Sequence, residues 1–473
     1  MATLMSCLAL LSQSRGTALA IAGSLLIVVA FVPGRTRRLY AALLIGAGVA
    51  LAAPDLLRVY EHARGATVSV GTAHAAGRTA LLASVGVGCA WGLLGTGWRA
   101  LASSAEPAQR MRLLGARVLF VPATVALVLG VASAGRIAHE ANTQWHAFVR
   151  LAEPGESAVP SASGATHSRL LSGSGNRYDY WRIALHTWRG HPLAGVGAGN
   201  YPRTYFERRS TTEDVQQPHS LELQVLSELG VVGALLLACV LVGASWGASR
   251  MHRRAARYEL WRALMVGALG MFAAWLVQGS VDWMHLLPGL TAMALAALAI
   301  LVWPRRAAPA AHRAPAAQRP PARLAGVLSR RPAVAAGAAA ALIVLIAAGA
   351  SLSRQGLAQL YRSRAQSELA RDPAAALADV DRSLDVDDDA AQTYYLRAAA
   401  LARFDQAQAA EAALAQALAR EPRNFVTWTL LGDISVREGR LRAAGRYYAR
   451  AHELNPRNPT VRQLASDPRA ALR

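Results

Sequence analysis

The chain has 473 residues, of which 53% are hydrophobic and only 17% are charged, and its mean hydropathy is +0.23. Together with several apolar runs near bilayer length, this composition predicts an all-α, polytopic membrane protein rather than a water-soluble globular domain. The net charge of +21 rests entirely on arginine, because the sequence contains no lysine. Most of the excess falls in short segments between apolar runs, so it indicates membrane orientation and argues against nucleic-acid binding.

The apolar runs predict eight membrane-spanning helices, preceded by a shorter apolar stretch at 1–11. This stretch lacks the basic region and the cleavage site of a signal peptide, so we interpret it as the end of a helix whose beginning is missing. The sequence is therefore expected to be truncated at its N-terminus. The predicted spans are 17–32, 39–53, 79–98, 113–133, 229–246, 261–280, 286–303 and 333–350.

The arginine-rich segments between these spans predict the orientation of the chain. The segments 33–38, 99–112, 249–259 and 304–331 alternate along the chain so that all four share one side of the membrane. By the positive-inside rule this side is the cytoplasm. The other side then receives Arg15, the segments 54–78, 134–218 and 280–289, and the C-terminus. We therefore predict a multi-pass protein of the cytoplasmic (inner) membrane with its long loop and C-terminus outside.

These patterns divide the chain into six parts. The first is a set of N-terminal membrane helices, followed by a large extracytoplasmic loop and a second set of membrane helices. A basic, Pro/Ala-rich cytoplasmic linker leads to the last span and to an extracytoplasmic region of repeats. The predicted boundaries are 1–133, 134–218, 219–303, 304–332, 333–350 and 354–473.

The C-terminal region contains a 34-residue repeat. The segments 391–424 and 425–458 have this length, and 357–390 is interpreted as a degenerate preceding copy. The second copy matches the tetratricopeptide pattern at Trp428, Leu431, Gly432, Ala444, Tyr448, Ala451 and Pro456. Such stacked helix pairs provide a concave surface for a protein partner. A role as a cap for the membrane part is an equal alternative.

The polar loop before the fifth span carries the residues with the strongest functional signals. Residues 176–190 predict an amphipathic helix, with Asn176 as N-cap and Asp179 at the capping-box position. Its apolar face is predicted to contain Trp181, Ala184, Leu185 and Trp188. Arg177 lies on the same face, which fits an anion ligand beside the membrane, and the helix equally fits an interfacial anchor.

Three further features of this region favour particular roles. The glycine-rich stretch GVGAGN (195–200) lacks the context of a phosphate-binding loop, so we interpret it as a tight turn that packs against a span. His219 is predicted to open the helix of that span, with Glu222 three residues later as its oriented carboxylate partner. Asp282 lies in a short loop close to the membrane, where it is either functional or a helix cap.

Taken in order, four motifs resemble the O-antigen ligase and polymerase superfamily. They are SQSRG (12–16), NRYDYW (176–181), PLAGVGAGNY (192–201) and PHSLELQVLSELGVVG (218–233), and the resemblance covers roughly residues 10–300. Members with C-terminal tetratricopeptide repeats also occur in this superfamily. Its members usually have about a dozen spans, and this chain departs from that pattern by lacking the first several. Either its start is misassigned, or the protein is a reduced homologue.

The resemblance implies a glycosyltransferase of lipopolysaccharide and cell-envelope biosynthesis, without a cofactor or a metal. Its donor is a glycan on undecaprenyl pyrophosphate, and its acceptor is lipid A–core, another lipid-linked unit or a protein. Arg15 and Arg177 are expected to bind the pyrophosphate, and His219 to act at the acceptor. The residues expected to contact substrate are Trp181, Arg203, Glu222 and Asp282. The alternative is a non-catalytic membrane scaffold that recruits envelope-assembly proteins through its repeats.

Overall fold

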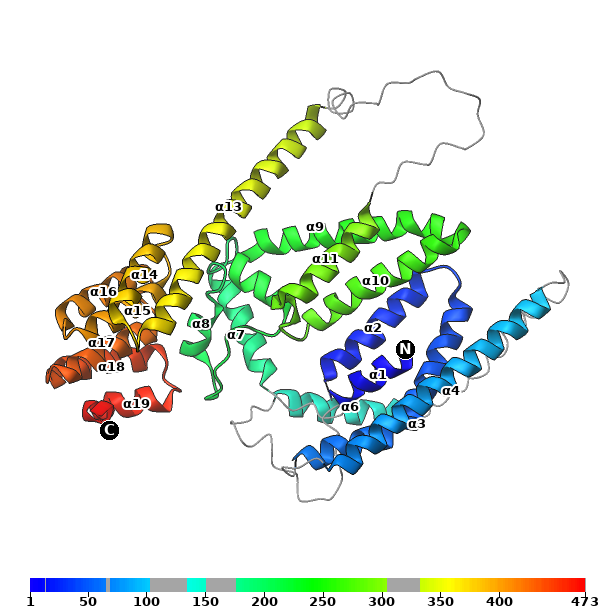
Figure 1. The fold of residues 1–473 in the computed structure, drawn as a ribbon, viewed down its shortest axis with the longest axis horizontal. Coiled ribbons are helices and arrows are strands. Elements are labelled where there is room, and N and C mark those ends of the chain that lie inside the picture. Colours follow the sequence, from blue (N-terminus) through cyan, green and yellow to red (C-terminus); the bar gives the residue numbers. More distant parts are fainter. Residues whose placement is uncertain (13, 65–68, 103–133, 150–175, 304–331, 473) are drawn as a thin grey trace. The chain divides into compact units, whose positions relative to one another are not determined.

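The computed structural model describes residues 1–12, 14–64, 69–102, 134–149, 176–303 and 332–472. Within these segments every regular element is a helix, as the sequence predicted (Figure 1). The chain divides into two compact units. The first contains Met1–Tyr205 and Arg209–Pro304, and the second contains Phe206–Arg208 and Arg305–Arg473.

The first unit contains most of the apolar helices and most of the polar segment that precedes α9. Four of its helices, α2, α9, α10 and α11, pack against one another, and α1, α3 and α4 form a second group. Helix α7 packs on α9 and contacts α6. The bounds are α1 (Ala2–Leu11), α2 (Arg15–Phe31), α3 (Arg35–Arg64), α4 (Val70–Ala102), α6 (Ala134–Val149), α7 (Arg177–Gly190), α8 (Tyr201–Arg208), α9 (Leu221–Arg257), α10 (Glu259–Gly279), the 3-10 turn η2 (Met284–Leu286) and α11 (Pro288–Val302).

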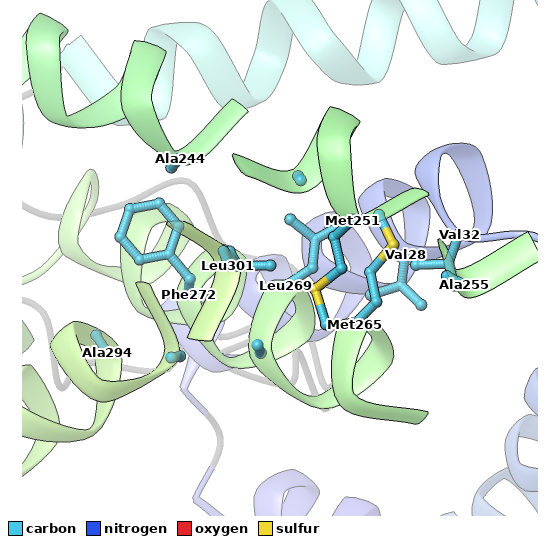
Figure 2. Close-up of a cluster of buried hydrophobic side chains, with 13 residues drawn as sticks. Val28, Val32, Ala244, Met251, Ala255, Met265, Leu269, Phe272, Ala294 and Leu301 are labelled. Atoms are coloured by element: carbon cyan, nitrogen blue, oxygen red, sulfur yellow. The ribbon is translucent and has the colours of Figure 1, made fainter. Parts of the chain in front are cut away.

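The core between α2, α9, α10 and α11 combines small residues with a few large ones (Figure 2). Ala244 and Ala248 lie one turn apart on α9, and both are buried. Gly247 lets this helix approach α11 so closely that an added Cβ would lie 2.6 Å from the carbonyl oxygen of Leu301. Because lipid gives helices no hydrophobic reason to associate, such close packing is what holds membrane helices together.

Most of the predicted spans coincide with apolar helices. Among the described residues, five helical stretches have the length and composition to cross a membrane, namely Arg35–Val59, Val70–Thr96, Leu221–Arg257, Glu259–Gly279 and Leu342–Glu368. Three shorter apolar helices are Ala2–Leu11, Arg15–Phe31 and Pro288–Val302. The predicted span at 113–133 lies outside the described residues, so the total number of spans and their sidedness stay predictions.

The three cysteines lie in two kinds of apolar environment. Cys7 is buried between α1, α3 and α4, whereas Cys89 and Cys239 are exposed on apolar helices. A cysteine on the outer face of a membrane helix meets lipid rather than a protein core, which is a comparable apolar environment. Periodicity alone does not distinguish these two environments.

The second unit consists of helix pairs. Helices α15 and α17 begin 34 residues apart, as do α16 and α18, which matches the period in the sequence. The ring of Tyr448 packs directly against Gly432, where a side chain would clash, because an added Cβ would lie 2.3 Å from Tyr448 Cε1. The assignment of the pairs to the tetratricopeptide class stays a prediction. The bounds are α13 (Pro332–Glu368), α14 (Pro373–Val386), α15 (Ala391–Arg403), α16 (Ala407–Arg420), α17 (Phe425–Arg437), α18 (Leu441–Leu454), α19 (Pro459–Ser466) and η3 (Pro468–Leu472).

One helix crosses a boundary of the predicted domain scheme. The last span was expected to end at 350 and the repeats to begin at 354, but α13 runs without a break from Pro332 to Glu368. Its C-terminal part packs with α14 as the first helix pair. The apolar pattern ends at the membrane boundary, whereas the helix continues because its polar part packs against α14.

A backbone junction fixes the polar loop to α9. Helix α9 is kinked at Gly230, where φ is +63°, and Gly195 of the glycine-rich turn has φ +66°. The amide of Gly197 donates to the carbonyl of Glu228 at 2.9 Å, and the amide of Val231 donates to the carbonyl of Pro192 at 2.9 Å. The turn therefore satisfies the backbone groups that the kink exposes. This confirms the prediction that residues 195–200 form a turn that packs against a span.

Neither Gly195 nor Gly230 leaves space for a side chain, and this makes the junction testable. A Cβ added to Gly195 would lie 2.3 Å from the carbonyl carbon of Glu228. A Cβ added to Gly230 would lie 2.3 Å from the carbonyl oxygen of Leu193. We expect Gly195→Ala and Gly230→Ala to lower stability by more than the roughly 1–2 kcal/mol that a left-handed backbone alone costs. Thermal unfolding of the detergent-solubilised chain measures this loss.

Two other glycines are matched controls for this experiment. Gly199 also has positive φ (+75°) but faces open space, so Gly199→Ala reports the backbone cost alone. Gly267 lies inside α10 with nothing within 4 Å of an added Cβ, so Gly267→Ala is expected to be neutral or slightly stabilising. Equal losses for Gly195→Ala and Gly199→Ala would show that the close approach to α9 contributes nothing.

Candidate active site

Helix α7 presents a different face to the protein than the sequence predicted. The helix packs on α9, and its buried residues are Asp179, Tyr180, Ile183, Ala184 and Thr187. Trp181 and Trp188 of the predicted apolar face lie at its edge and are half-buried. The prediction was wrong by about one position because it ranked side chains by hydrophobicity. The packing instead selects Tyr180, whose hydroxyl has a polar partner, and Thr187, whose hydroxyl donates to the carbonyl of Ile183.

The predicted capping box of α7 is absent. The Asn176 side chain makes no cap and donates instead to Oε2 of Glu213 at 2.9 Å. The Asp179 side chain is fully buried and accepts from the Ser210 amide at 2.9 Å and from Arg182 Nη2 at 2.7 Å. Both side chains therefore hold the segment 209–220 against α7. Their partners in this segment, Glu213 and Ser210, lie more than thirty residues away, so local spacing did not reveal them.

Tyrosines and one arginine complete this attachment. Glu213 also accepts a hydrogen bond of 2.5 Å from the hydroxyl of Tyr180, and burial raises the pKa of that hydroxyl, so Tyr180 remains a donor. Tyr205 donates to the carbonyl of Glu213 at 2.9 Å. The buried guanidinium of Arg209 donates to the carbonyls of Thr212 and Glu213 and pairs with the Asp214 carboxylate. The segment is thus ordered by polar contacts on both sides.

His219 lies at the end of this segment in a defined orientation. Its backbone is left-handed (φ +55°), and its Nδ1–H donates to the carbonyl of Gln217 at 3.0 Å. The ring lies 5.4 Å from that of Tyr180, measured between centroids. Burial lowers the pKa of the imidazole below 6.5 despite the nearby carboxylates, so the ring is neutral at pH 7 with its lone pair on Nε2.

The predicted His219–Glu222 pair does not form. Helix α9 begins at Leu221, and the Ser220 side chain caps it by accepting from the amide of Leu223. His219 precedes the helix, so the spacing of three residues does not place it above Glu222. The carboxylate of Glu222 instead accepts from Ser280 Oγ at 2.6 Å and from Ser220 Oγ at 3.1 Å. Glu222 thereby joins the start of α9 to the end of α10.

The structure brings several of the predicted site residues to one place. Nη2 of Arg177 lies 3.7 Å from Oδ2 of Asp282, and both groups act electrostatically on His219. The start of α2, where Arg15 is the first residue, also lies there. An added Cβ at Gly16 would be 3.7 Å from Oδ2 of Asp282. Residues from α2, α7, the α9 cap and the segment after α10 therefore converge, although they are far apart in sequence.

Two predicted substrate contacts lie at the margin of this cluster. Trp181 is next to Phe148 of α6, with ring centroids 5.5 Å apart. Arg203 lies on α8 two residues from the buried Tyr201, which puts it on the other side of this short helix. None of the contacts that join Arg177, Asp282 and His219 involves either residue. Their assignment to substrate binding stays a prediction.

His285 was missed by sequence reasoning and belongs to the cluster. Its Nε2–H donates to Oε1 of Gln224 at 2.9 Å, and the Gln224 amide donates to the buried Glu228 carboxylate at 3.4 Å. Burial lowers the pKa of His285, on which Glu222, Asp282 and His219 also act. The residue occurs in a short loop without a motif, so the only available signal was its position three residues after Asp282.

Fold and site together define a polytopic helical membrane protein whose polar cluster lies where several helices begin or end. Residues 65–238 match the family model described as O-antigen ligase. This match supports the resemblance to the O-antigen ligase superfamily, and three of the four motifs, at 176–181, 192–201 and 218–233, lie within the matched segment. The search of curated proteins found no significant match. Arg177, His219 and Glu222 lie inside the matched segment, whereas Arg15 and Asp282 lie outside it.

The attachment of the segment 209–220 to α7 predicts the effect of removing Glu213. Glu213→Ala deletes the acceptor for both Asn176 and Tyr180, so we expect a loss of roughly 1–2 kcal/mol. Amide hydrogen exchange in residues 209–220 should be faster, and it is measured on the solubilised full chain. Gln216→Ala, at an exposed position of the same segment, is the control. Equal exchange in the two variants would contradict the proposed anchoring.

Proposed function

We propose that the chain transfers a glycan from a polyprenyl pyrophosphate, namely undecaprenyl pyrophosphate, to an acceptor hydroxyl at the membrane surface. The match of residues 65–238 to the O-antigen ligase family model supports a membrane glycosyltransferase. The observation that carries the specific proposal is the convergence of Arg177, Asp282 and His219 beside the start of α2. Two arginines and a neutral histidine are the groups that this reaction requires.

The reaction forms one bond and breaks one bond at the anomeric carbon of the glycan. The oxygen of the acceptor hydroxyl attacks that carbon, and the bond from the carbon to the pyrophosphate oxygen breaks. The pyrophosphate leaves with the electron pair, and the hydroxyl proton moves to His219. The barrier is lowered by groups that stabilise the growing negative charge of the leaving group and accept the proton.

Arg177 is suited to bind the pyrophosphate. Its separation of 3.7 Å from Asp282 is a charge contact longer than a hydrogen bond, and about a third of its side chain is exposed (32%). The guanidinium thus keeps donors for phosphate oxygens while Asp282 fixes its position. Arg15, at the start of α2, is proposed as the second arginine. A fork of two guanidiniums supplies this charge without requiring a metal.

His219 is suited to accept the proton. Because the carbonyl of Gln217 holds Nδ1–H, the lone pair of the neutral ring is on Nε2. The lowered pKa keeps this lone pair available at pH 7. Gln224, His285 and Glu222 are proposed as positioning residues, because they tie the segment that carries Asp282 to the first turn of α9.

The orientation of the chain and the acceptor complete the proposal. The arginine-rich segments favour a site on the outer face of the cytoplasmic membrane, where lipid-linked glycans are presented. The acceptor is lipid A–core or another glycan or protein. Trp181 and Arg203 are proposed to contact the sugars. The helix pairs of the second unit favour an additional protein partner, and they also support the alternative of a non-catalytic scaffold.

Substitution of the two central residues separates these alternatives. Arg177→Ala removes charge stabilisation and His219→Ala removes the proton acceptor, so each should lower transfer by roughly 100-fold or more. The measurement is the ratio of transferred to lipid-linked glycan at equal protein abundance. Arg189→Ala and His186→Ala, at exposed positions of α7, are the matched controls. Unchanged glycan transfer in both Arg177→Ala and His219→Ala would refute the catalytic proposal and favour the scaffold.

The pH dependence of kcat/KM tests the role of His219 separately. Since burial lowers its pKa from 6.5, the ring should remain a competent base at pH 7 and lose activity only as it is protonated at lower pH. We expect a flat profile at neutral pH and an acid limb that falls tenfold per pH unit, with its midpoint below 6.5. An acid limb with a midpoint above 6.5 would contradict the assignment of this limb to His219.

A further inference from the structure

The ends of α2 and α10 remote from the candidate active site carry a dense group of arginines. The turn from α2 to α3 and the turn from α9 to α10, residues 32–38 and 250–262, contain eight arginines and a single carboxylate, Glu259. Three of the arginines, Arg35, Arg38 and Arg262, form what we call the arginine cluster. We propose that this cluster binds the phosphate of an anionic phospholipid, a site that goes beyond the proposed glycosyl transfer.

Backbone carbonyls hold the three guanidiniums in place. Arg38 donates to the carbonyls of Pro33, at 2.7 Å, and Val32. Arg35 Nη2 donates to the carbonyl of Ala30 at 2.8 Å. On the other turn, Arg262 donates to the carbonyls of Ala255 at 3.0 Å and Ala256 at 3.3 Å. These carbonyls lie at the C-terminal ends of α2 and α9, and each carries only a partial negative charge.

The cluster is therefore left with an excess of positive charge. Arg35 and Arg262 act electrostatically on Arg38, and both Arg38 and Arg262 flank Gly34, whose added Cβ would lie 3.8 Å from Arg38 Nη1 and 4.0 Å from Arg262 Cδ. Within the described part of the chain no carboxylate pairs with any of the three, and Nε of Arg38 is buried without a hydrogen-bond partner. Several like charges held together by fixed geometry are the arrangement that an anion stabilises.

The surroundings of the cluster favour a lipid over a free anion. Exposed apolar and aromatic side chains surround it, including Leu39, Tyr258 and Leu260. Arg250 lies over the exposed ring of Trp246 at 4.8 Å, and Arg254 lies over Trp261 at 5.4 Å, which is typical of a membrane–water interface. A phosphodiester with acyl chains satisfies both the charge and the apolar surface, and basic pockets between membrane helices bind such headgroups.

The location separates this site from the candidate active site. Arg15 begins α2 beside Asp282, whereas the cluster lies where α2 ends, and α2 has 17 residues. At 1.5 Å per residue the two ends are roughly 25 Å apart. The same holds for α10, which ends beside Glu222 and begins next to the cluster. The lipid would thus occupy the leaflet opposite the active site and brace the helices that carry it.

The proposal is tested by lipid binding to the full chain in neutral detergent, measured by native mass spectrometry. Phosphatidylglycerol is the probe, phosphatidylcholine is the uncharged reference, and inorganic phosphate tests whether the headgroup charge alone is enough. We expect Arg38→Gln combined with Arg262→Gln to raise the dissociation constant for phosphatidylglycerol roughly tenfold or more. Binding of phosphatidylcholine should not change.

A charge-matched control isolates the cluster from general attraction. Arg253 and Arg257 are exposed on the same turn. The double variant Arg253→Gln and Arg257→Gln therefore loses the same number of charges as the Arg38/Arg262 double variant. An equal loss of phosphatidylglycerol binding in the two double variants would overturn the proposal. Binding of inorganic phosphate without binding of phosphatidylglycerol would also overturn it. If the Arg38/Arg262 double variant does not fold, Arg35→Gln takes its place, since its guanidinium donates only to Ala30. An unchanged dissociation constant in that variant would equally overturn the proposal.

Discussion

The candidate active site depends on the backbone junction between the turn at 195–200 and the kink of α9. Gly230 interrupts the helix with a left-handed residue, and the freed carbonyls and amides are satisfied by the turn. In a membrane protein an unsatisfied backbone group near the bilayer is costly, so kink and turn require each other. The junction places the connection between α7 and α8 directly on α9. The aromatic and polar contacts that orient His219 are built on this base.

A second dependence links the two ends of α2 and α10. These helices pack along their length through Gly23 and Val277, where an added Cβ would lie 3.1 Å from the valine side chain. One pair of ends meets where Gly16 approaches Gln278 and Asp282. The other pair lies at the core residues Val32 and Met265, which Figure 2 shows beside Met251 and Ala255. Because packed helices move as rigid elements, displacement at one end changes the spacing at the other. The arrangement of Arg177 and Asp282 is thus coupled to the packing of the whole group.

The sequence predicted those features that depend on local pattern. Apolar runs predicted the helices, the 34-residue period predicted the helix pairs, and Gly195 predicted a turn that requires close backbone approach. The partners of polar side chains were not predictable in this way. Asn176 and Asp179 fit a capping box by spacing, but contacts with Glu213 and Ser210 displace it. Tertiary partners of this kind override local preference, because a buried carboxylate needs every available donor.

The residues of the site follow the same division. Arg177 and His219 were identified because ordered motifs carry them, whereas His285 has no motif and became visible only through its bond to Gln224. The supposed pair of His219 and Glu222 failed for a backbone reason. Helical spacing presumes helical φ and ψ, and His219 is left-handed, so the carboxylate turns to the serines at 220 and 280 instead. A sequence pattern does not reveal a positive φ at a residue other than glycine.

The conformation of His219 bears on the role that we propose for it. A left-handed backbone is unfavourable for a residue with a Cβ, and such outliers persist where the surroundings determine them, most often at active sites. Glycine would relieve the strain at this position and asparagine would reduce it. Only an imidazole, however, provides both the Nδ1–H that the Gln217 carbonyl fixes and a free Nε2 lone pair. Burial and a fixed tautomer together suit the neutral, oriented base that we propose for His219.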